Sequence, residues 1–262
     1  MTIDYSAAEA LVREAGAMLL NASPAPETIH AKGGEANFVT DTDVKIQSFL
    51  FERLSALVPG AAFFGEEDTR GNTRGLSDGY TFIIDPIDGT TNFMFGYNFS
   101  CVSVGLAYGK RMLAGWVYNP YARTMMHAVR GEGAYLNGRR VYAGNRSVEN
   151  GLIAFSCARY NDQHIDKLFD TVKALFYKSL SVRLGGSAAI DLSRVAAGSN
   201  TAYLEMLLQP YDYAAASLLI EEAGGVITQL DGSAITLDRP CSILAGTVQA
   251  HAQILSMWNG GR

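Results

Sequence analysis

The sequence contains few cysteines and no apolar run long enough to cross a membrane. Its three cysteines, Cys101, Cys157 and Cys241, are far apart among 262 residues and form no CxxC pair. An odd number of scattered cysteines predicts reduced thiols in a cytoplasmic protein rather than a disulfide framework. No apolar run approaches the ~20 residues that span a bilayer. The acids Asp4, Glu9 and Glu14 do not fit a signal peptide, so we expect no membrane partner.

The sequence also lacks an excess of positive charge and the common motifs of covalent catalysis. The net charge is −5 at pH 7, which gives no electrostatic footprint for nucleic acid. The small cluster of Arg139, Arg140 and Arg146 is more typical of a solvated face. There is no P-loop and no nucleophile-elbow serine. The four histidines lack the spacing of zinc ligands, so zinc is not expected.

Alternating helix and strand patterns run through the whole chain, and 48% of the residues are hydrophobic, enough for an extensive core. Apolar periodicity predicts helices over about 5–20, 41–58, 162–176, 187–197, 212–223 and 248–258. Strands are predicted over 61–64, 80–84, 101–106, 113–118, 124–129, 152–156, 201–206, 226–227 and 242–245. We therefore predict a mixed α/β (α+β) fold of layered sheets and helices. Residues 1–262 form one domain in this prediction, with an N-terminal lobe of about 1–146 and a C-terminal lobe of about 147–262.

One stretch, Asp-Pro-Ile-Asp-Gly-Thr-Thr at residues 85–91, follows a short run typical of a buried strand. Pro86 removes an amide donor and predicts that the regular strand ends there. Gly89 allows a close approach of the backbone, and the amides at Thr90 can point outward. An Asp-Gly pair alone is typical of a turn. Two acids beside an apolar strand, however, repel each other and lose hydration, and a divalent cation relieves both costs.

Further acids occur where predicted strands end or helices begin, namely Glu66 and Asp212. Together with Asp85, Asp88 and a loop carbonyl such as that of Ile87, they predict the all-oxygen ligation that suits Mg²⁺.

Two other candidates have competing structural interpretations. Asp43 falls in the first turn of a predicted helix, where acids are stabilised in any case. Lys32 is a lone cation in a predicted loop, and the sequence alone favours a solvated surface lysine.

Amides that can hold a phosphate oxygen, next to a cation site, suggest hydrolysis of a phosphate monoester, and the difficulty of that reaction limits the possible mechanisms. Phosphate monoesters need rate enhancements up to about 10²¹, whereas one general base supplies only about 10²–10⁴. Metal ions that neutralise the entering and leaving oxygens can supply much of the remainder. An acidic cluster beside amides that can hold phosphate is therefore best interpreted as a metal-assisted phosphatase.

These residues resemble the inositol monophosphatase family. The resemblance includes Gly65-Glu66-Glu67, the stretch 85–93, Gly186-Ser187-Ala188-Ala189, and Tyr211-Asp212 through Gly225, and it covers nearly the whole chain. It implies a layered αβαβα sandwich that is often dimeric, hydrolysis by metal-activated water, and inhibition by lithium.

The resemblance also implies residue roles. The metal ligands would be Glu66, Asp85, the Ile87 carbonyl, Asp88 and Asp212. The catalytic residues would be Thr90, Asp43 and Glu66, with Thr90 oriented by Asp43. The substrate contacts would be Gly89, Thr90, Gly186, Ala188, Glu205, Asp212 and Lys32.

Departures from the family pattern lie near the expected rim of the site and leave the substrate open. Tyr211 stands where the family usually has tryptophan, and residues 94–98 lack the basic residue or histidine, and the proline after it, that the family often has. Inositol 1-phosphate is the first candidate substrate. Histidinol phosphate, fructose 1,6-bisphosphate and a nucleotide 3′-phosphate are alternatives in the same class. A non-catalytic protein that acts through an RNA or protein partner is the alternative from a different class.

Overall fold

The computed structural model describes residues 3–22, 29–31, 38–67, 69, 71–73, 75–157 and 165–260. Within these residues the α-helices are α1 (Tyr5–Asn21), α2 (Asp41–Leu57), α3 (Thr90–Met94), α4 (Ile165–Lys178), α5 (Ala188–Ala196), α6 (Pro210–Glu222) and α7 (Val248–Gly260), with a short 3₁₀ helix, η2 (Val148–Asn150). No helix among the described residues combines the length and apolar character that crossing a membrane requires.

The strands form two large sheets and one short antiparallel pair. The pair is β1 (Ile29–Ala31) with β2 (Phe38–Thr40). The first large sheet has the order β3 (Ala62–Gly65), β4 (Tyr80–Asp88), β5 (Cys101–Tyr108), β6 (Arg111–Asn119), β7 (Thr124–Val129), β8 (Gly133–Leu136) and β9 (Arg139–Val141). The second has the order β11 (Ser181–Leu184), β10 (Leu152–Phe155), β12 (Ala202–Leu208), β14 (Cys241–Gly246) and β13 (Val226–Thr228).

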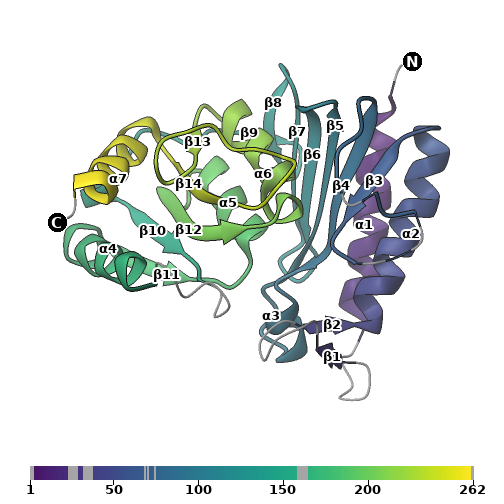
Figure 1. The fold of residues 1–262 in the computed structure, drawn as a ribbon, viewed down its shortest axis with the longest axis horizontal. Helices are drawn as coiled ribbons and strands as arrows, with labels where there is room; N and C mark the ends of the chain where they lie inside the picture. Colours follow the sequence, from purple (N-terminus) through teal and green to yellow (C-terminus); the bar gives the residue numbers. More distant parts are fainter. Residues whose placement is uncertain are drawn as a thin grey trace.

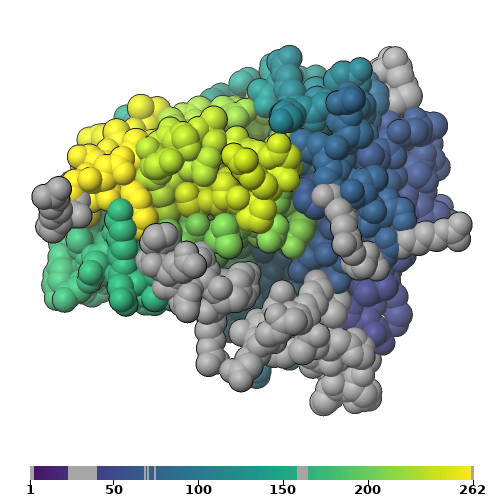
Figure 2. All heavy atoms as spheres, viewed as in Figure 1, coloured from purple at the N-terminus to yellow at the C-terminus, as the bar shows by residue number. Residues whose placement is uncertain are grey.

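Helices and sheets alternate in five layers (Figure 1). Helices α1 and α2 cover the outer face of the first sheet, and α5 and α6 lie between the two sheets. Helices α4 and α7 cover the outer face of the second sheet. The predicted αβαβα sandwich is thus confirmed. Figure 2 shows the green and yellow second half of the chain packed directly against the blue first half.

Alternating side chains explain why each sheet is covered on both faces. In β4, Phe82 and Ile84 pack with α1 and α2, while Ile83 between them packs with α5 and α6. In β12, Tyr203 faces the central helices and Leu204 faces α4 and α7. Strands buried on both faces read as continuous apolar runs, as residues 80–84 do.

The prediction that Pro86 ends the strand is wrong. Strand β4 continues to Asp88, but its pairing with β5 shifts by one residue between Asp85, opposite Ser103, and Asp88, opposite Cys101. A bulge is one of the few places where a sheet tolerates proline. The bulge lies between the two acids at the end of the strand.

Five strands were not predicted, namely β1, β2, β8, β9 and β11. Two of them, β8 and β9, were missed because their ends carry turn signals. The prediction treats residues 131–133 and 137–138 as turns, and the chain indeed turns at Asn137 and Gly138. On either side of that turn lie β8 and β9, three to four residues each. Strands this short show too little alternation to be recognised. The division into two lobes near residue 146 stays a prediction, although the strands of the two sheets come from either side of it.

Candidate functional site

Two acids at the end of β4 meet a third acid from a distant part of the chain. Asp85, Asp88 and Asp212 each place a carboxylate oxygen within 4.8 Å of the others. The first two end β4, and the third lies in the first turn of α6, where its Oδ2 accepts a 2.8 Å hydrogen bond from the amide of Gln209. Residues at a strand end and at a helix start therefore share one space.

The close packing of α6 on the first sheet brings Asp212 to this position. A Cβ added to Gly115 in β6 would lie only 2.6 Å from the carbonyl oxygen of Ala215 in α6. The helix surface facing the sheet carries the small residues Ala214 and Ala215, which are both buried and lie against Gly105 and Gly115. A larger side chain at this contact would lift the helix and move Asp212 away from β4.

Burial makes the charged forms of the three acids unfavourable. It raises the pKa of Asp85 and of Asp212 well above the usual range, and neighbouring carboxylates raise both further. Burial also raises the pKa of Asp88 to about 6, although hydrogen bonds to its carboxylate oppose the shift. No ion pair among the described residues includes any of these three acids. Buried carboxylate oxygens that lie close together and have no cationic side chain in an ion pair with them, among the described residues, are suited to bind a hard divalent cation.

Asp88 is also fixed by the N-terminus of α5. Its Oδ2 accepts hydrogen bonds from the hydroxyl of Ser187 and, at 2.8 Å, from the amide of Ala189. Its Oδ1 accepts a longer bond of 3.3 Å from the amide of Ala188. Unpaired amides at a helix start favour a carboxylate. These bonds hold Asp88 in one orientation.

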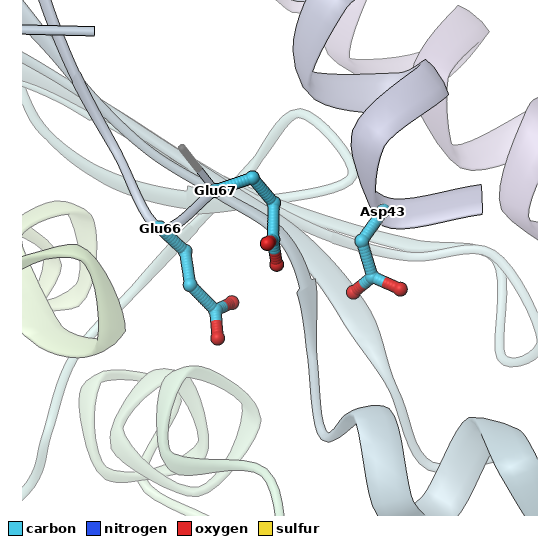
Figure 3. A group of neighbouring side chains, drawn as sticks. All are labelled: Asp43, Glu66 and Glu67. Carbon is cyan, nitrogen blue, oxygen red and sulfur yellow. The ribbon is translucent and has the colours of Figure 1, made fainter. Parts of the chain in front are cut away.

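A second group of acids lies beside the first. Asp43, Glu66 and Glu67 place carboxylate oxygens within 4.8 Å of one another, and Figure 3 shows the three side chains pointing to the same side. The amide of Glu66 donates a 3.1 Å hydrogen bond to the carbonyl of Ile84, which ties the end of β3 to β4. Glu66 is near enough to raise the pKa of both Asp85 and Asp212.

The contacts of Asp43 fit both the structural interpretation, in which it caps a helix, and the catalytic one, in which it orients Thr90. Its Oδ2 accepts hydrogen bonds from the amide and hydroxyl of Thr40, at 2.8 and 2.5 Å, and so caps α2. Its Oδ1 lies 3.5 Å from the hydroxyl of Thr90. That hydroxyl also lies 3.0 Å from the carbonyl oxygen of Ile87. The hydroxyl proton of Thr90 therefore has two possible acceptors, the carboxylate of Asp43 and the carbonyl oxygen of Ile87.

The predicted substrate contacts lie on the C-terminal side of the same space. Gly186 has φ +79° in the turn before α5, and Ala188 is the first residue of that helix. Glu205 in β12 is buried and accepts a hydrogen bond from the hydroxyl of Tyr203. Burial raises the pKa of Glu205 to about 8. Lys32 lies outside the described residues.

Gln47 is a positioning residue that the sequence did not reveal. Its side chain is fully buried on α2, and its amide group donates a 2.8 Å hydrogen bond to the carbonyl of Glu67 and accepts a 2.9 Å bond from the amide of that residue. The available signal was a polar residue four positions after Asp43, on the apolar face of the helix.

The fold and the acidic site together define a metal-dependent phosphoric monoester hydrolase. Residues 2–259 match the model of the family described as "Inositol monophosphatase family", and the chain belongs to that family.

Curated relatives agree with this assignment. The chain is 36% identical over 228 residues to an inositol-1-monophosphatase of Caulobacter vibrioides, covering 86% of this chain and 88% of the relative. It is 32% identical over 245 residues to an inositol-1-monophosphatase of Bacillus subtilis, covering 93% and 91%.

Solved structures show the same fold. The extragenic suppressor protein suhB from Bartonella henselae matches with a TM-score of 0.89 and 29% identity, over 98% of this chain and 99% of that one. A staphylococcal enzyme, SaIMPase-II with bound inositol monophosphate, matches with a TM-score of 0.78 and 28% identity, over 97% and 92%.

Proposed function

We propose that this phosphatase hydrolyses inositol 1-phosphate to inositol and phosphate with the help of Mg²⁺. The observation that carries the proposal is the convergence of Asp85, Asp88 and Asp212 next to Gly89 and Thr90. We call the backbone amides of Gly89 and Thr90 the phosphate seat. The curated relatives named inositol-1-monophosphatase support the choice of substrate.

The donor set fits Mg²⁺. Glu66, Asp85 and the carbonyl of Ile87 would hold one ion. Asp85, Asp88 and Asp212 would hold a second, and Glu66 would contribute to a weaker third. When bound, Mg²⁺ supplies positive charge to the phosphate oxygens and lowers the pKa of water.

The side chains around the seat divide the remaining work. The hydroxyl of Thr90 lies between Asp43 and the Ile87 carbonyl. In our proposal it orients the attacking water, accepts a proton from that water and passes its own proton to Asp43. The amides of Gly89 and Thr90 bind phosphate oxygens. Glu66 adds a second carboxylate beside Asp43 that can take part in the proton transfer.

The acid in the substrate region favours a polyol over an amine. With its pKa raised to about 8, Glu205 is mostly protonated at pH 7. A neutral carboxyl group can donate and accept hydrogen bonds to sugar hydroxyls, together with Gly186 and Ala188, but it does not attract an ammonium group. This favours inositol 1-phosphate over histidinol phosphate. Lys32 stays a predicted contact.

We also infer that the chain is a cytoplasmic, lithium-sensitive homodimer. Cys101 and Cys241 are buried free thiols, as expected in a reducing compartment. Strand β11 lies at the edge of its sheet; Leu180, directly before it, is 69% exposed, and Leu184, its last residue, is 58% exposed. An exposed apolar edge is a natural place for a second copy to pack. Analytical ultracentrifugation and lithium titration of the activity test these two properties.

A substrate panel tests the proposed function. Phosphate release is measured from inositol 1-phosphate, histidinol phosphate, fructose 1,6-bisphosphate and a nucleotide 3′-phosphate, each with Mg²⁺ and with a chelator. We expect the highest kcat/KM for inositol 1-phosphate and no release with the chelator. A higher kcat/KM for another ester would replace the substrate, and no release from any ester would overturn the function.

A further inference from the structure

Asn92 in α3 joins the two halves of the active site. The two hydrogens of its side-chain amide reach two different carbonyl oxygens. One is that of Phe99 at 2.8 Å, and the other is that of Gly185, 93 residues further along the chain, at 2.9 Å. An asparagine amide has two such hydrogens, so both are used. A single side chain thereby holds α3 against the turn 185–188, which we call the ring turn.

The phosphate seat and the ring turn are in direct contact at this point. Gly89 has φ +90°, and a Cβ on it would lie 3.0 Å from the carbonyl oxygen of Phe99 and 3.1 Å from that of Gly186. Gly186 has φ +79°, and a Cβ there would lie 3.1 Å from Nδ2 of Asn92. Both glycines have positive φ, and a methyl group on either would make a tighter contact than Cβ atoms ordinarily make, with a backbone carbonyl at Gly89 and with the Asn92 side chain at Gly186.

The ring turn is held at both ends by different residues. On its C-terminal side, Ser187 and Ala189 bind the carboxylate of Asp88. On its N-terminal side, the chain arrives from β11, an edge strand whose last residue, Leu184, is 58% exposed. The bond from Asn92 to Gly185 therefore fixes the turn where the sheet supports it least.

We propose that Asn92 is a positioning residue that sets the distance between the phosphate seat and the ring turn, and so sets the selectivity for a polyol phosphate over a simple phosphate ester. This rests on the proposed function, in which Gly186 and Ala188 contact the inositol hydroxyls. A displaced ring turn weakens contacts to the ring while leaving the metal ligands in place. An ester whose leaving group carries no hydroxyls is insensitive to that displacement.

The test compares two substrates in the Asn92→Asp and Asn92→Ala variants of the full chain. Aspartate keeps the shape of the side chain but removes both donated hydrogens, and alanine removes the side chain without adding charge. For inositol 1-phosphate, we expect kcat/KM to fall about ten- to hundredfold with a raised KM, as small displacements in active sites do. For p-nitrophenyl phosphate, with the same Mg²⁺, we expect a loss of at most about threefold.

Asn137→Asp is the matched control. Asn137 also donates its side-chain amide to a backbone carbonyl, that of Arg123 at 3.1 Å, but it lies in the turn between β8 and β9. This variant should lower kcat/KM for both substrates by the same factor or leave it unchanged. Equal losses for both substrates in the two Asn92 variants, or no loss for either, would overturn the inference. No release from inositol 1-phosphate by the unaltered chain would instead overturn the proposed function on which it depends.

Discussion

The backbone amide of Ala189 donates a 2.8 Å hydrogen bond to Oδ2 of Asp88, although the two residues are 101 positions apart in the chain. The bond connects the start of α5 to the end of β4. Asp88, at the end of a strand of the first sheet, is thus oriented by α5, which follows strand β11 of the second sheet. The predictions below concern this junction and the acids around it.

Replacing Asp88 should greatly lower the activity and remove the stabilisation by Mg²⁺. Asp88→Asn keeps the shape of the side chain but removes a charged oxygen donor. Loss of groups that merely orient metal ligands costs about 10–100-fold in affinity or activity, so we expect a decrease of about a hundredfold or more in kcat/KM. A ligand at 100 times its Kd stabilises a fold by about 2.7 kcal/mol. Differential scanning fluorimetry with and without Mg²⁺ should show this gain in the parent chain and not in the variant.

Asp78→Asn is the control for that experiment, because Asp78 is exposed and lies before β4. It should retain both the activity and the thermal shift. An Asp88→Asn protein that Mg²⁺ stabilises as strongly as the parent would show that this acid is not a ligand.

Gly89→Ala should be far more damaging than the same change at Gly96. Both glycines have positive φ, +90° and +64°. A Cβ at Gly89 would press on the carbonyl oxygens of Phe99 and Gly186 at 3.0 and 3.1 Å, whereas nothing lies within 4 Å of one at Gly96. Both variants bear backbone strain of about 1–2 kcal/mol, and Gly89→Ala should lose about 1–3 kcal/mol more from the clash. Urea unfolding measures the difference, and equal losses would contradict the packing described.

Gln47→Ala should weaken Mg²⁺ binding without touching a ligand. The change leaves the buried amide of Glu67 without the bond that Gln47 accepts from it at 2.9 Å, at a cost of about 1–3 kcal/mol. The neighbouring Glu66 should then be less well placed, and the Kd for Mg²⁺ should rise about tenfold. Isothermal titration calorimetry measures the affinity.

Gln253→Ala provides the comparison for Gln47. Its Oε1 likewise accepts a 2.9 Å bond from a backbone amide, that of Val148. A similar loss of stability is expected, with an unchanged Kd for Mg²⁺. If both variants bind Mg²⁺ as the parent does, Gln47 has a purely structural role.

Without metal, the folded chain should lose stability as the pH rises. Burial raises the pKa of Asp191 to about 7 and that of Glu205 to about 8. Between pH 4 and pH 8 the folded chain therefore binds more protons than the unfolded chain, so the free energy of unfolding falls as protons are withdrawn. The stabilisation is complete below about pH 4 and is lost as the pH passes through 7 and 8. Each pKa unit corresponds to about 1.4 kcal/mol, so the total decline is on the order of several kcal/mol.

Chemical unfolding in a chelating buffer from pH 5 to pH 8.5 measures this slope. The Asp191→Asn and Glu205→Gln variants should each flatten it. A stability that does not change with pH in the parent chain would contradict the raised pKa values.

Local patterns in the sequence predict the layers, because the periodicity of residues 5–20 and 80–84 reports directly which faces are buried. They also place Asp85 and Asp212 at element ends, where side chains can meet. They do not reveal Gln47 or Ser187, because a buried hydrogen bond depends on a partner distant in the chain. Strand β4 runs through Pro86 for a similar reason, since the bulge that tolerates it is formed together with β5.

The meeting of Asp212 with Asp85 and Asp88 makes the acidic cluster an assembly marker for the chain. Asp85 and Asp88 belong to a strand of the first sheet, whereas Asp212 lies in the helix that follows β12 of the second sheet. A partly folded intermediate with only one sheet in place therefore has an incomplete set of oxygen donors. Cation affinity should consequently appear late during refolding. Mg²⁺ would then act selectively on the completed native state and slow its unfolding, while leaving earlier intermediates unaffected.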